Sequence, residues 1–153
     1  MAINSRFAVG VHILALLEIN KQQRITSDLI AGSVNTNPVV VRRMMSLLSK
    51  AGLIRTSPGV AGATLARPIE RITLLDVYKA VQGDDGDPLF SMHDKPNPAC
   101  LVGRNIQGAL DKSFREAEAA MERQLAGVTL DSVIRDIVER DGQAGSVSPL
   151  CRE

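Results

Sequence analysis

The sequence NPVVVRRMMSLLSKAG, residues 37–52, has the clearest helix boundaries in the chain. Asn37 can cap a helix, Pro38 fits the first helical position, and Gly52 can adopt the left-handed conformation that ends a helix. These boundaries predict a helix over about residues 38–51. Its inward-packing side chains recur at helical spacing and are Val41, Met44, Met45 and Leu48.

A shorter helix is predicted just before it, separated by the polar link of Asn35 and Thr36. Thr26 is a good N-cap for this helix, and Asp28 places a negative charge in its first turn. Its inward face would consist of Leu29, Ile30 and Val34. Such a pair forms a helix-turn-helix, whose second helix can insert its N-terminal residues into the major groove of DNA. A helix over about residues 5–19 would mostly supply core.

The exposed leading end of the helix over residues 38–51 offers groups that bind DNA. The candidates are Asn35, Asn37, Val39, Arg42 and Arg43. Amide and guanidinium groups hydrogen-bond to base edges or phosphates, and an arginine favours guanine, which presents two acceptors in the major groove. Adjacent arginines are more often ordinary solvated charges, but their position after a capped turn favours DNA contact.

A β-hairpin is predicted next. Residues 53–56 alternate like a strand, residues 57–62 form a turn, and residues 63–67 return. As a wing beside the helix-turn-helix, this hairpin would reach a flanking groove of DNA, and a plain surface hairpin is the alternative. Its expected DNA contacts, through small residues near phosphates and through two cations, are Arg55, Gly59, Gly62, Thr64 and Arg67.

Charge is divided unevenly along the 153 residues, although the net charge is only +1. Residues 1–81 carry 10 Lys and Arg against 4 Asp and Glu, a net +6, whereas residues 82–153 carry 8 against 13, a net −5. A basic first half suggests contact with a polyanion. Only 3% of residues are aromatic and Trp is absent, which favours duplex over single-stranded nucleic acid. No targeting or membrane-spanning segment is recognised, so we expect a cytoplasmic protein.

The acidic half begins with a helix over about residues 73–81 and a loop over residues 82–99 that is rich in Gly, Asp, Pro and Asn. Cys100 ends this loop at the start of the following helix. It is either a reactive thiol whose pKa the helix N-terminus lowers, and hence a regulatory residue, or a small buried apolar group. Cys151 is the only other cysteine, so no disulfide framework is expected.

A long helix over residues 101–126 carries a single apolar stripe, whose members are Ile106, Leu110, Phe114, Ala117, Met121 and Leu125. A stripe of this length in so small a protein would expose too much apolar surface unless a second subunit covered it. A last helix over about residues 130–140 would face inward through Val133, Ile134 and Ile137. We therefore expect a DNA-binding domain (residues 1–82), a regulatory loop (83–100), dimerisation helices (101–140) and a disordered tail (141–153).

Several segments resemble the Rrf2 family of bacterial transcription regulators, over about residues 2–138. They are Lys50-Ala-Gly-Leu-Ile54, Leu65-Ala-Arg67, Ile72-Thr-Leu-Leu-Asp-Val77 and Cys100-Leu-Val-Gly103. Within the family, the sequence is most similar to the YwnA-like members that lack an iron–sulfur cluster. The resemblance implies a mainly α winged helix-turn-helix domain, a long dimerisation helix, and a homodimer that reads a palindromic site and usually represses transcription.

The sequence departs from the iron–sulfur members of that family in three places. Those members carry three cysteines before the dimerisation helix, whereas this chain has Cys100 alone, with Ser91 and Asn97 near where the other thiolates would fall. No cofactor or metal is therefore expected. Arg42 stands where those members often have a base-reading Glu, and Pro58 replaces an Arg of the wing, so a different operator is expected.

No catalytic constellation is recognised, so the chain is not expected to be an enzyme. Its two histidines, His12 and His93, lie in distinct contexts. One alternative to DNA binding is a regulatory module that acts mainly through a protein partner and retains residual DNA affinity. Two signals also stay open: modification of the thiol of Cys100, or a small molecule in a cavity between the winged domain and the dimerisation helix.

Overall fold

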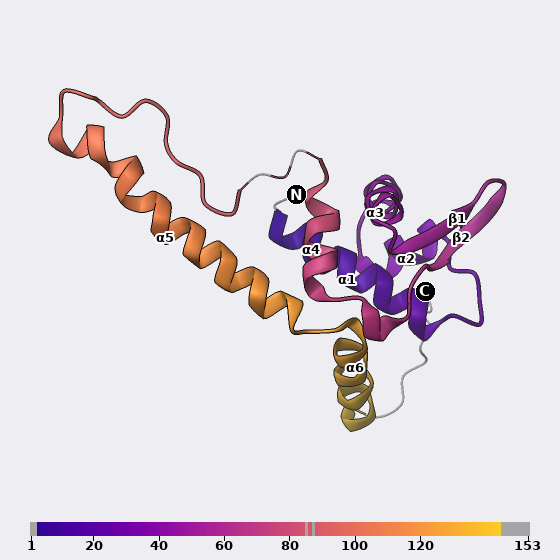
Figure 1. The fold of residues 1–153 in the computed structure, drawn as a ribbon. Coiled ribbons are helices and arrows are strands. Elements are labelled where there is room, and N and C mark those ends of the chain that lie inside the picture. The colour runs from indigo at the N-terminus through magenta and orange to yellow at the C-terminus, as the bar shows by residue number, and fades with distance from the viewer. Residues whose placement is uncertain (1–2, 85, 87, 145–153) are drawn as a thin grey trace.

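The structure is a computed structural model that describes residues 3–84, 86 and 88–144 (Figure 1). It is mainly helical with one antiparallel hairpin, which confirms the predicted fold class. In chain order the elements are α1 (Ile3–Ile19), α2 (Ser27–Val34), α3 (Pro38–Lys50), β1 (Ile54–Ser57), β2 (Val60–Leu65), the 3₁₀ turn η1 (Ile69–Arg71), α4 (Leu74–Gln82), α5 (Leu101–Ala126) and α6 (Leu130–Ala144). None of the described helices combines the length and apolarity that a membrane span requires.

The hydrophobic core lies among α1, α2, α3, α4 and the base of the hairpin. Its fully buried members are mostly Leu, Ile and Val, because a chain with few aromatic residues must fill its interior with aliphatic side chains. Val41, Met44, Met45 and Leu48 of α3 are all buried, as predicted. This packing fixes α3 by its inner face and leaves its outer face to solvent.

Helix boundaries follow the predicted caps. The side chain of Thr26 accepts a hydrogen bond from the Leu29 amide, and that of Asn37 accepts one from the Val39 amide at 2.7 Å. Asn35 lies in the left-handed region at φ 59° and turns the chain from α2 towards α3. The predicted inward face of α2 was wrong for Leu29, which is half exposed, because Ile30 and Ala31 of this short helix fill the space against the core.

The hairpin is longer and its turn tighter than predicted. β2 begins at Val60, not at residue 63, because Pro58 and Gly59 alone make the turn, with Gly59 at φ +72°. Thr56 pairs with Ala63 but Ser57 pairs with Val60, so the two residues between, Ala61 and Gly62, form a bulge. The predicted turn over residues 57–62 was therefore wrong for Ser57, which ends β1, and for residues 60–62.

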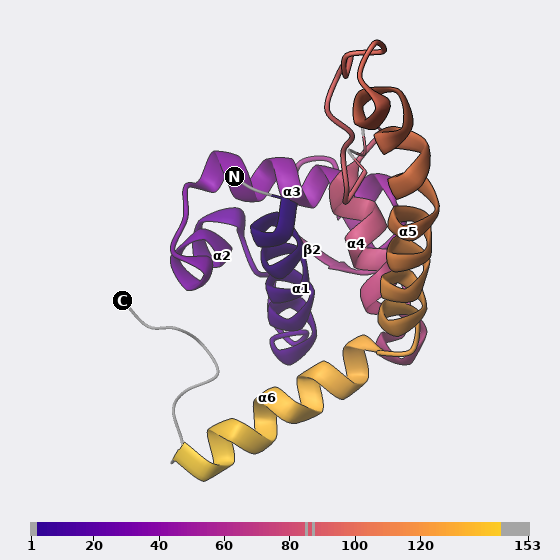
Figure 2. The same cartoon turned by 90° about the vertical axis from the view of Figure 1, so that its left-hand side faces the viewer.

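α5 spans Leu101–Ala126 as predicted and extends away from the core along one side of α4 (Figures 1 and 2). Of these 26 residues, all of them described, none is buried. The loop before α5 covers part of the stripe, where Phe90 stacks on Phe114 with ring centroids 5.0 Å apart. The large side chains of the apolar stripe are therefore only partly buried in the single chain.

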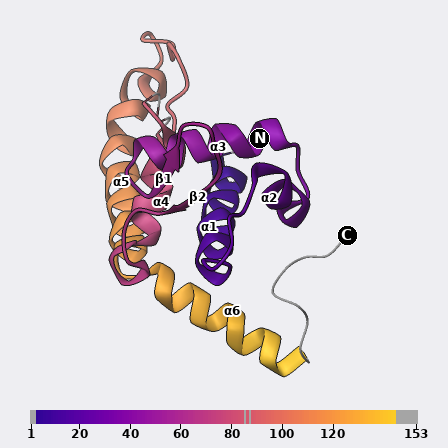
Figure 3. The ribbon, with the colours of Figure 1, turned by 90° about the vertical axis from the view of Figure 1, so that its right-hand side faces the viewer.

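α6 turns back below α1, as Figures 2 and 3 show. Leu130 and Ile134 are buried, but Ile137, which was expected to face inward, is 40% exposed because it lies at the rim of the α1–α6 contact. The helix continues to Ala144, so residues 141–144 of the expected tail are helical; residues 145–153 of that tail lie outside the described residues.

Two backbone hydrogen bonds join the ends of α5 and α6 to the segment before α4. The Leu74 amide donates to the Val128 carbonyl at 2.9 Å, and the Leu130 amide donates to the Ile72 carbonyl at 2.8 Å. Thr73 and Thr129 form the isolated β-bridge between them. The C-terminal end of α5 is thus held by main-chain contacts, which do not depend on side-chain rotamers, to the domain that carries α3.

Candidate nucleic-acid interface

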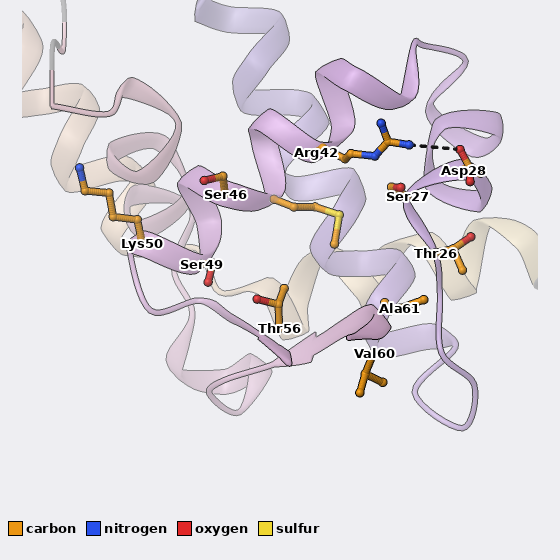
Figure 4. Close-up of a pocket in the computed structure, with 12 residues that line it drawn as sticks. Thr26, Ser27, Asp28, Arg42, Ser46, Ser49, Lys50, Thr56, Val60 and Ala61 are labelled. Carbon is orange, nitrogen blue, oxygen red and sulfur yellow. Dashed lines mark ion pairs between the residues drawn. The ribbon is translucent and has the colours of Figure 1, made fainter. Parts of the chain in front are cut away.

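An open groove of about 790 Å³ lies between the start of α2, the outer face of α3 and the hairpin (Figure 4). The α3 side of the groove is formed by residues that recur about once per turn, namely Arg42, Met45, Ser46, Ser49 and Lys50. The opposite walls come from Thr26, Ser27 and Asp28 of the α2 start and from Thr56, Val60, Ala61 and Gly62 of the hairpin. The groove therefore follows the exposed face of the helix that the core holds in place.

Most of the polar groups in the groove are hydroxyls and cations. Ser27, Ser46, Ser49 and Thr56 offer hydroxyls, which can donate to phosphate oxygens. Arg42 extends across the groove towards Asp28, with Nη2 3.9 Å from Oδ1 (Figure 4). Lys50, at the other end of α3, points away from the hairpin in Figure 4 and pairs with Asp84. Among the described residues that line the groove, Asp28 alone carries a carboxylate. This chemistry suits the sugar–phosphate backbone of a nucleic acid.

The five predicted residues at the leading end of α3 are all on the surface, but Arg42 alone of them lines the groove. Asn35, Asn37, Val39, Arg42 and Arg43 are all exposed, with Val39 at 65%. Since the Oδ1 atom of Asn37 caps α3, only the amide nitrogen of that side chain is available to a ligand. Arg43 forms no ion pair with any residue that the structure describes, so its charge is available to an anion.

The predicted hairpin residues divide into two groups. Arg55 and Thr64 are paired across the hairpin and exposed, and Gly59 forms its tip with open space around its Cα. Gly62 instead packs against the segment before α2: a Cβ at this position would lie 3.0 Å from the Ile25 carbonyl oxygen. Arg67 lies beyond β2, and its Nη1 is 3.8 Å from the Asp76 carboxylate, so it is directed towards the start of α4.

Sequence reasoning missed several residues of this surface. Ser46 and Ser49 follow Arg42 at helical spacings of four and three, and that spacing could have identified them. Ser27 could have been found from the helix N-terminus, where polar side chains meet anions. Arg24 donates to the Ala61 carbonyl at 3.4 Å and so braces the hairpin, a contact across 37 positions that has no local signal.

Cys100 is the N-cap of α5, whose N-terminal end lies far from α3 and the hairpin in Figure 1. It is exposed, which contradicts the interpretation of this residue as a buried apolar group. Hydrogen bonds from the Gly103 and Val102 amides lower the pKa of the Cys100 thiol. The thiolate is therefore more populated at neutral pH than that of an ordinary cysteine.

The residues around Cys100 do not fit an iron centre held by one chain. No three His, Cys, Asp or Glu side chains gather as a metal site would need within residues 3–84, 86 and 88–144. Of the residues near the positions of the missing thiolates, Asn97 uses its Oδ1 atom to accept the Ala99 amide, and Ser91 offers a hydroxyl, a poor substitute for a soft sulfur ligand.

A second, apolar cavity of about 440 Å³ lies between α1 and α6, lined by Ala8, Val11, His12, Ala15, Leu16, Ile19 and Ile137. His12 is half buried and its Nε2 atom lies 2.8 Å from the Ser33 hydroxyl of α2. Burial lowers the pKa of His12, so the imidazole is neutral at physiological pH. This cavity is bounded by α6 and not by α5, the dimerisation helix beside which a small-molecule cavity was predicted.

A helix-turn-helix whose second helix lies beside a β-hairpin, with cations and hydroxyls on their shared face, defines a winged-helix DNA-binding protein. Residues 3–136 match the Rrf2 family, described as iron-dependent transcriptional regulators. The chain belongs to this family, whose members regulate transcription and are not enzymes. The iron in that description finds no matching set of ligands among the described residues.

Known relatives extend over nearly the whole described chain. YwnA of Bacillus subtilis (strain 168), provisionally described as an HTH-type transcriptional regulator, is 48% identical over 135 residues, which are 88% of this chain and 98% of YwnA. A crystal structure provisionally described as that of a DNA-binding protein is 46% identical with a TM-score of 0.69, over 84% of this chain and 98% of that one. These similarities confirm the predicted family, its DNA-binding and regulatory class, and the absence of an enzymatic role.

A more distant protein shares the fold of this chain. The structure of CymR, the global cysteine regulator of B. subtilis, has a TM-score of 0.61 at 18% identity, over 88% of this chain and 97% of CymR. The winged fold with its long C-terminal helices is therefore kept where four residues in five differ.

Proposed function

We propose that the chain binds a palindromic operator as a homodimer and represses transcription from it, with α3 in the major groove and the hairpin as a wing. The observation that carries this proposal is the groove between α3 and the hairpin, in which cations and hydroxyls from three elements share one face. Arg42 and Lys50 line that face, and Arg43 and Arg55 are exposed residues of α3 and of the hairpin. These cations would replace counterions on phosphates. Arg42, Arg43 and the apolar Val39 are positioned to distinguish bases, Val39 through the methyl group of thymine.

The partly buried stripe of α5 supports the homodimer. Ile106, Leu110, Phe114, Met121 and Leu125 lie along one helix that rises about 39 Å from end to end. A second copy of the same stripe is the simplest complementary surface, and a two-fold axis through it would present two α3 helices to DNA. A two-fold dimer of this kind reads a palindrome, with half-sites about one helical turn apart or a multiple of it.

Selection from a randomised duplex pool at fixed salt tests the DNA contact. The wild-type protein is expected to enrich a palindrome, and Arg42→Ala should weaken binding and relax the preference for guanine at one position in each half-site. Arg135→Ala on α6 removes the same charge far from the groove and serves as the matched control. Failure of the wild-type protein to enrich any sequence would favour action through a protein partner. Binding to such a partner need not weaken steeply with salt, whereas binding to DNA does.

Sedimentation tests the dimer. Leu110→Glu or Met121→Glu places a charge in the stripe and is expected to give a monomer that binds only half-sites, weakly. Gln124→Glu adds the same charge at an exposed position of α5 and should leave the dimer intact. A wild-type protein that sediments as a monomer at concentrations well above its operator affinity contradicts the proposal.

Two inputs could change operator affinity, and one variant separates them. Cys100 is exposed and its thiol is acidified, which favours oxidation as the signal. If so, peroxide should lower the operator affinity of the wild-type protein and not that of Cys100→Ser. If Cys100→Ser responds to peroxide as the wild type does, the thiol is not the sensor, and the apolar cavity beside His12 becomes the site to test with small molecules.

A further inference from the structure

The carboxylate of Asp28 stands in a groove that is otherwise suited to an anion. Asp28 lies in the first turn of α2, and its side chain is 75% exposed. Its Oδ1 atom is 3.9 Å from Nη2 of Arg42, which is the cation closest to the leading end of α3 among those lining the groove (Figure 4). A negative charge at this point opposes phosphate binding, so its presence calls for a reason.

Helix stabilisation gives a partial reason. An acidic residue in a first turn interacts favourably with the helix dipole, and Thr26 already caps α2. That role needs a carboxylate in the first turn of α2 but does not need Arg42 beside it. The contact between the two side chains links α2 to α3 across the proposed DNA-binding face, and helix stability does not account for it.

We propose that Asp28 is a specificity-determining residue that withholds Arg42 from phosphates and releases it to the correct base. This inference rests on the proposed function. Both side chains are mostly exposed, so the pair is weak and readily exchanged. Guanine is neutral and offers two acceptors in fixed geometry, so it can replace Asp28 as the partner of Arg42. A phosphate competes with the Asp28 carboxylate for the same guanidinium, and the negative charge of Asp28 repels it.

The consequence differs between correct and incorrect DNA. On an unrelated duplex, Arg42 stays with Asp28 and contributes little to counterion release, so non-specific affinity is held down. On the operator, Arg42 moves to its base, and its hydrogen bonds to guanine offset the cost of leaving Asp28. Asp28 therefore raises the ratio of specific to non-specific affinity without contacting a base itself.

The test compares wild-type protein, Asp28→Asn and Glu139→Gln on the selected operator and on a scrambled duplex, over a series of salt concentrations. Glu139 lies on α6, is exposed, and supplies the matched loss of one negative charge. Asp28→Asn is expected to bind the scrambled duplex roughly two- to fivefold more tightly, the equivalent of one surface ion pair, with less gain on the operator. Its salt dependence on the scrambled duplex should steepen by about 0.9, one extra phosphate contact.

A double variant isolates the role of Arg42. In an Arg42→Ala background, Asp28→Asn should no longer change the ratio of the two affinities, because the residue that Asp28 restrains is gone. The proposal is overturned if Asp28→Asn changes both affinities equally, if it matches Glu139→Gln, or if its effect persists without Arg42. A lower melting temperature with an unchanged ratio would leave only the helix role. If the wild-type protein itself does not prefer the operator, the proposed function fails first.

Discussion

Replacing Gly62 with alanine should destabilise the protein and displace the hairpin, because two separate costs meet at this position. At φ +90° an L-amino acid is strained, at a cost of roughly 1–2 kcal/mol. The added Cβ would also lie 3.0 Å from the Ile25 carbonyl oxygen and 3.3 Å from the Arg24 Cβ. The first of these is a backbone atom, and it cannot move aside as a flexible side chain would. We expect a total loss of about 2–3 kcal/mol, or about 5–10 °C in melting temperature for a chain of this size.

Gly59→Ala is the matched control, since Gly59 has φ +72° but nothing within 4 Å of the added Cβ. It should lose only the conformational part, about 1 kcal/mol. Urea unfolding at one fixed protein concentration measures both, because the stability of an oligomer depends on concentration. If the two variants lose equal stability, or Gly62→Ala is as stable as the wild type, then the close contact between the bulge and Ile25 does not exist in solution.

Three further predictions follow from buried and titrating groups. Leu130→Ala should cost about 2–5 kcal/mol in urea unfolding, because Leu130 is fully buried where α6 begins, whereas the exposed Val138→Ala should cost far less. Burial lowers the pKa of His12 below its ordinary value of 6.5, so the unfolded chain takes up a proton before the folded chain does as the pH falls. The stability that neutral His12 provides is therefore complete above about pH 6.5 and is lost on acidification. Between pH 7.5 and 5.5 the wild type should lose more stability than His12→Gln. An equal loss in both proteins would contradict the assigned role of His12. In a Cys151→Ser background, the rate at which iodoacetamide alkylates Cys100 should reach half its maximum at a pH below 9.0, the pKa of a free cysteine. A midpoint at or above that value would show that the amides of Gly103 and Val102 do not stabilise the thiolate.

Local signals in the sequence were sufficient to place α3 and α4. Asn37, Pro38 and Gly52 define α3 because capping and left-handed geometry depend on a few adjacent residues. The same is true of Thr73, whose capping box with Asp76 starts α4. The leading-end residues of α3 were likewise predictable, since exposure on a helix follows from the period of its apolar side chains.

Features that depend on distant residues could not be predicted. Gly62 looks like part of a turn in sequence, but its conformation is set by contact with Ile25, 37 positions earlier. Arg67 appeared to be a wing cation, yet Asp76 and the Arg71 carbonyl hold it at the start of α4. The contact of Asp28 with Arg42 was missed for the same reason, because it depends on the angle between α2 and α3 and not on either sequence alone.

The main-chain joint between residues 72–74 and 128–130 makes α5 behave as a lever. Its C-terminal end is fixed to the domain that carries α3, while its N-terminal end, which Cys100 caps, lies far from that domain. A tilt of about 5° over a helix of about 39 Å displaces the far end by about 3 Å. In a dimer joined along α5, a small change in the angle between the two helices would therefore alter the separation of the two α3 helices. A chemical change at the start of α5 would then alter how the two α3 helices fit the DNA, without any change within the winged domain itself.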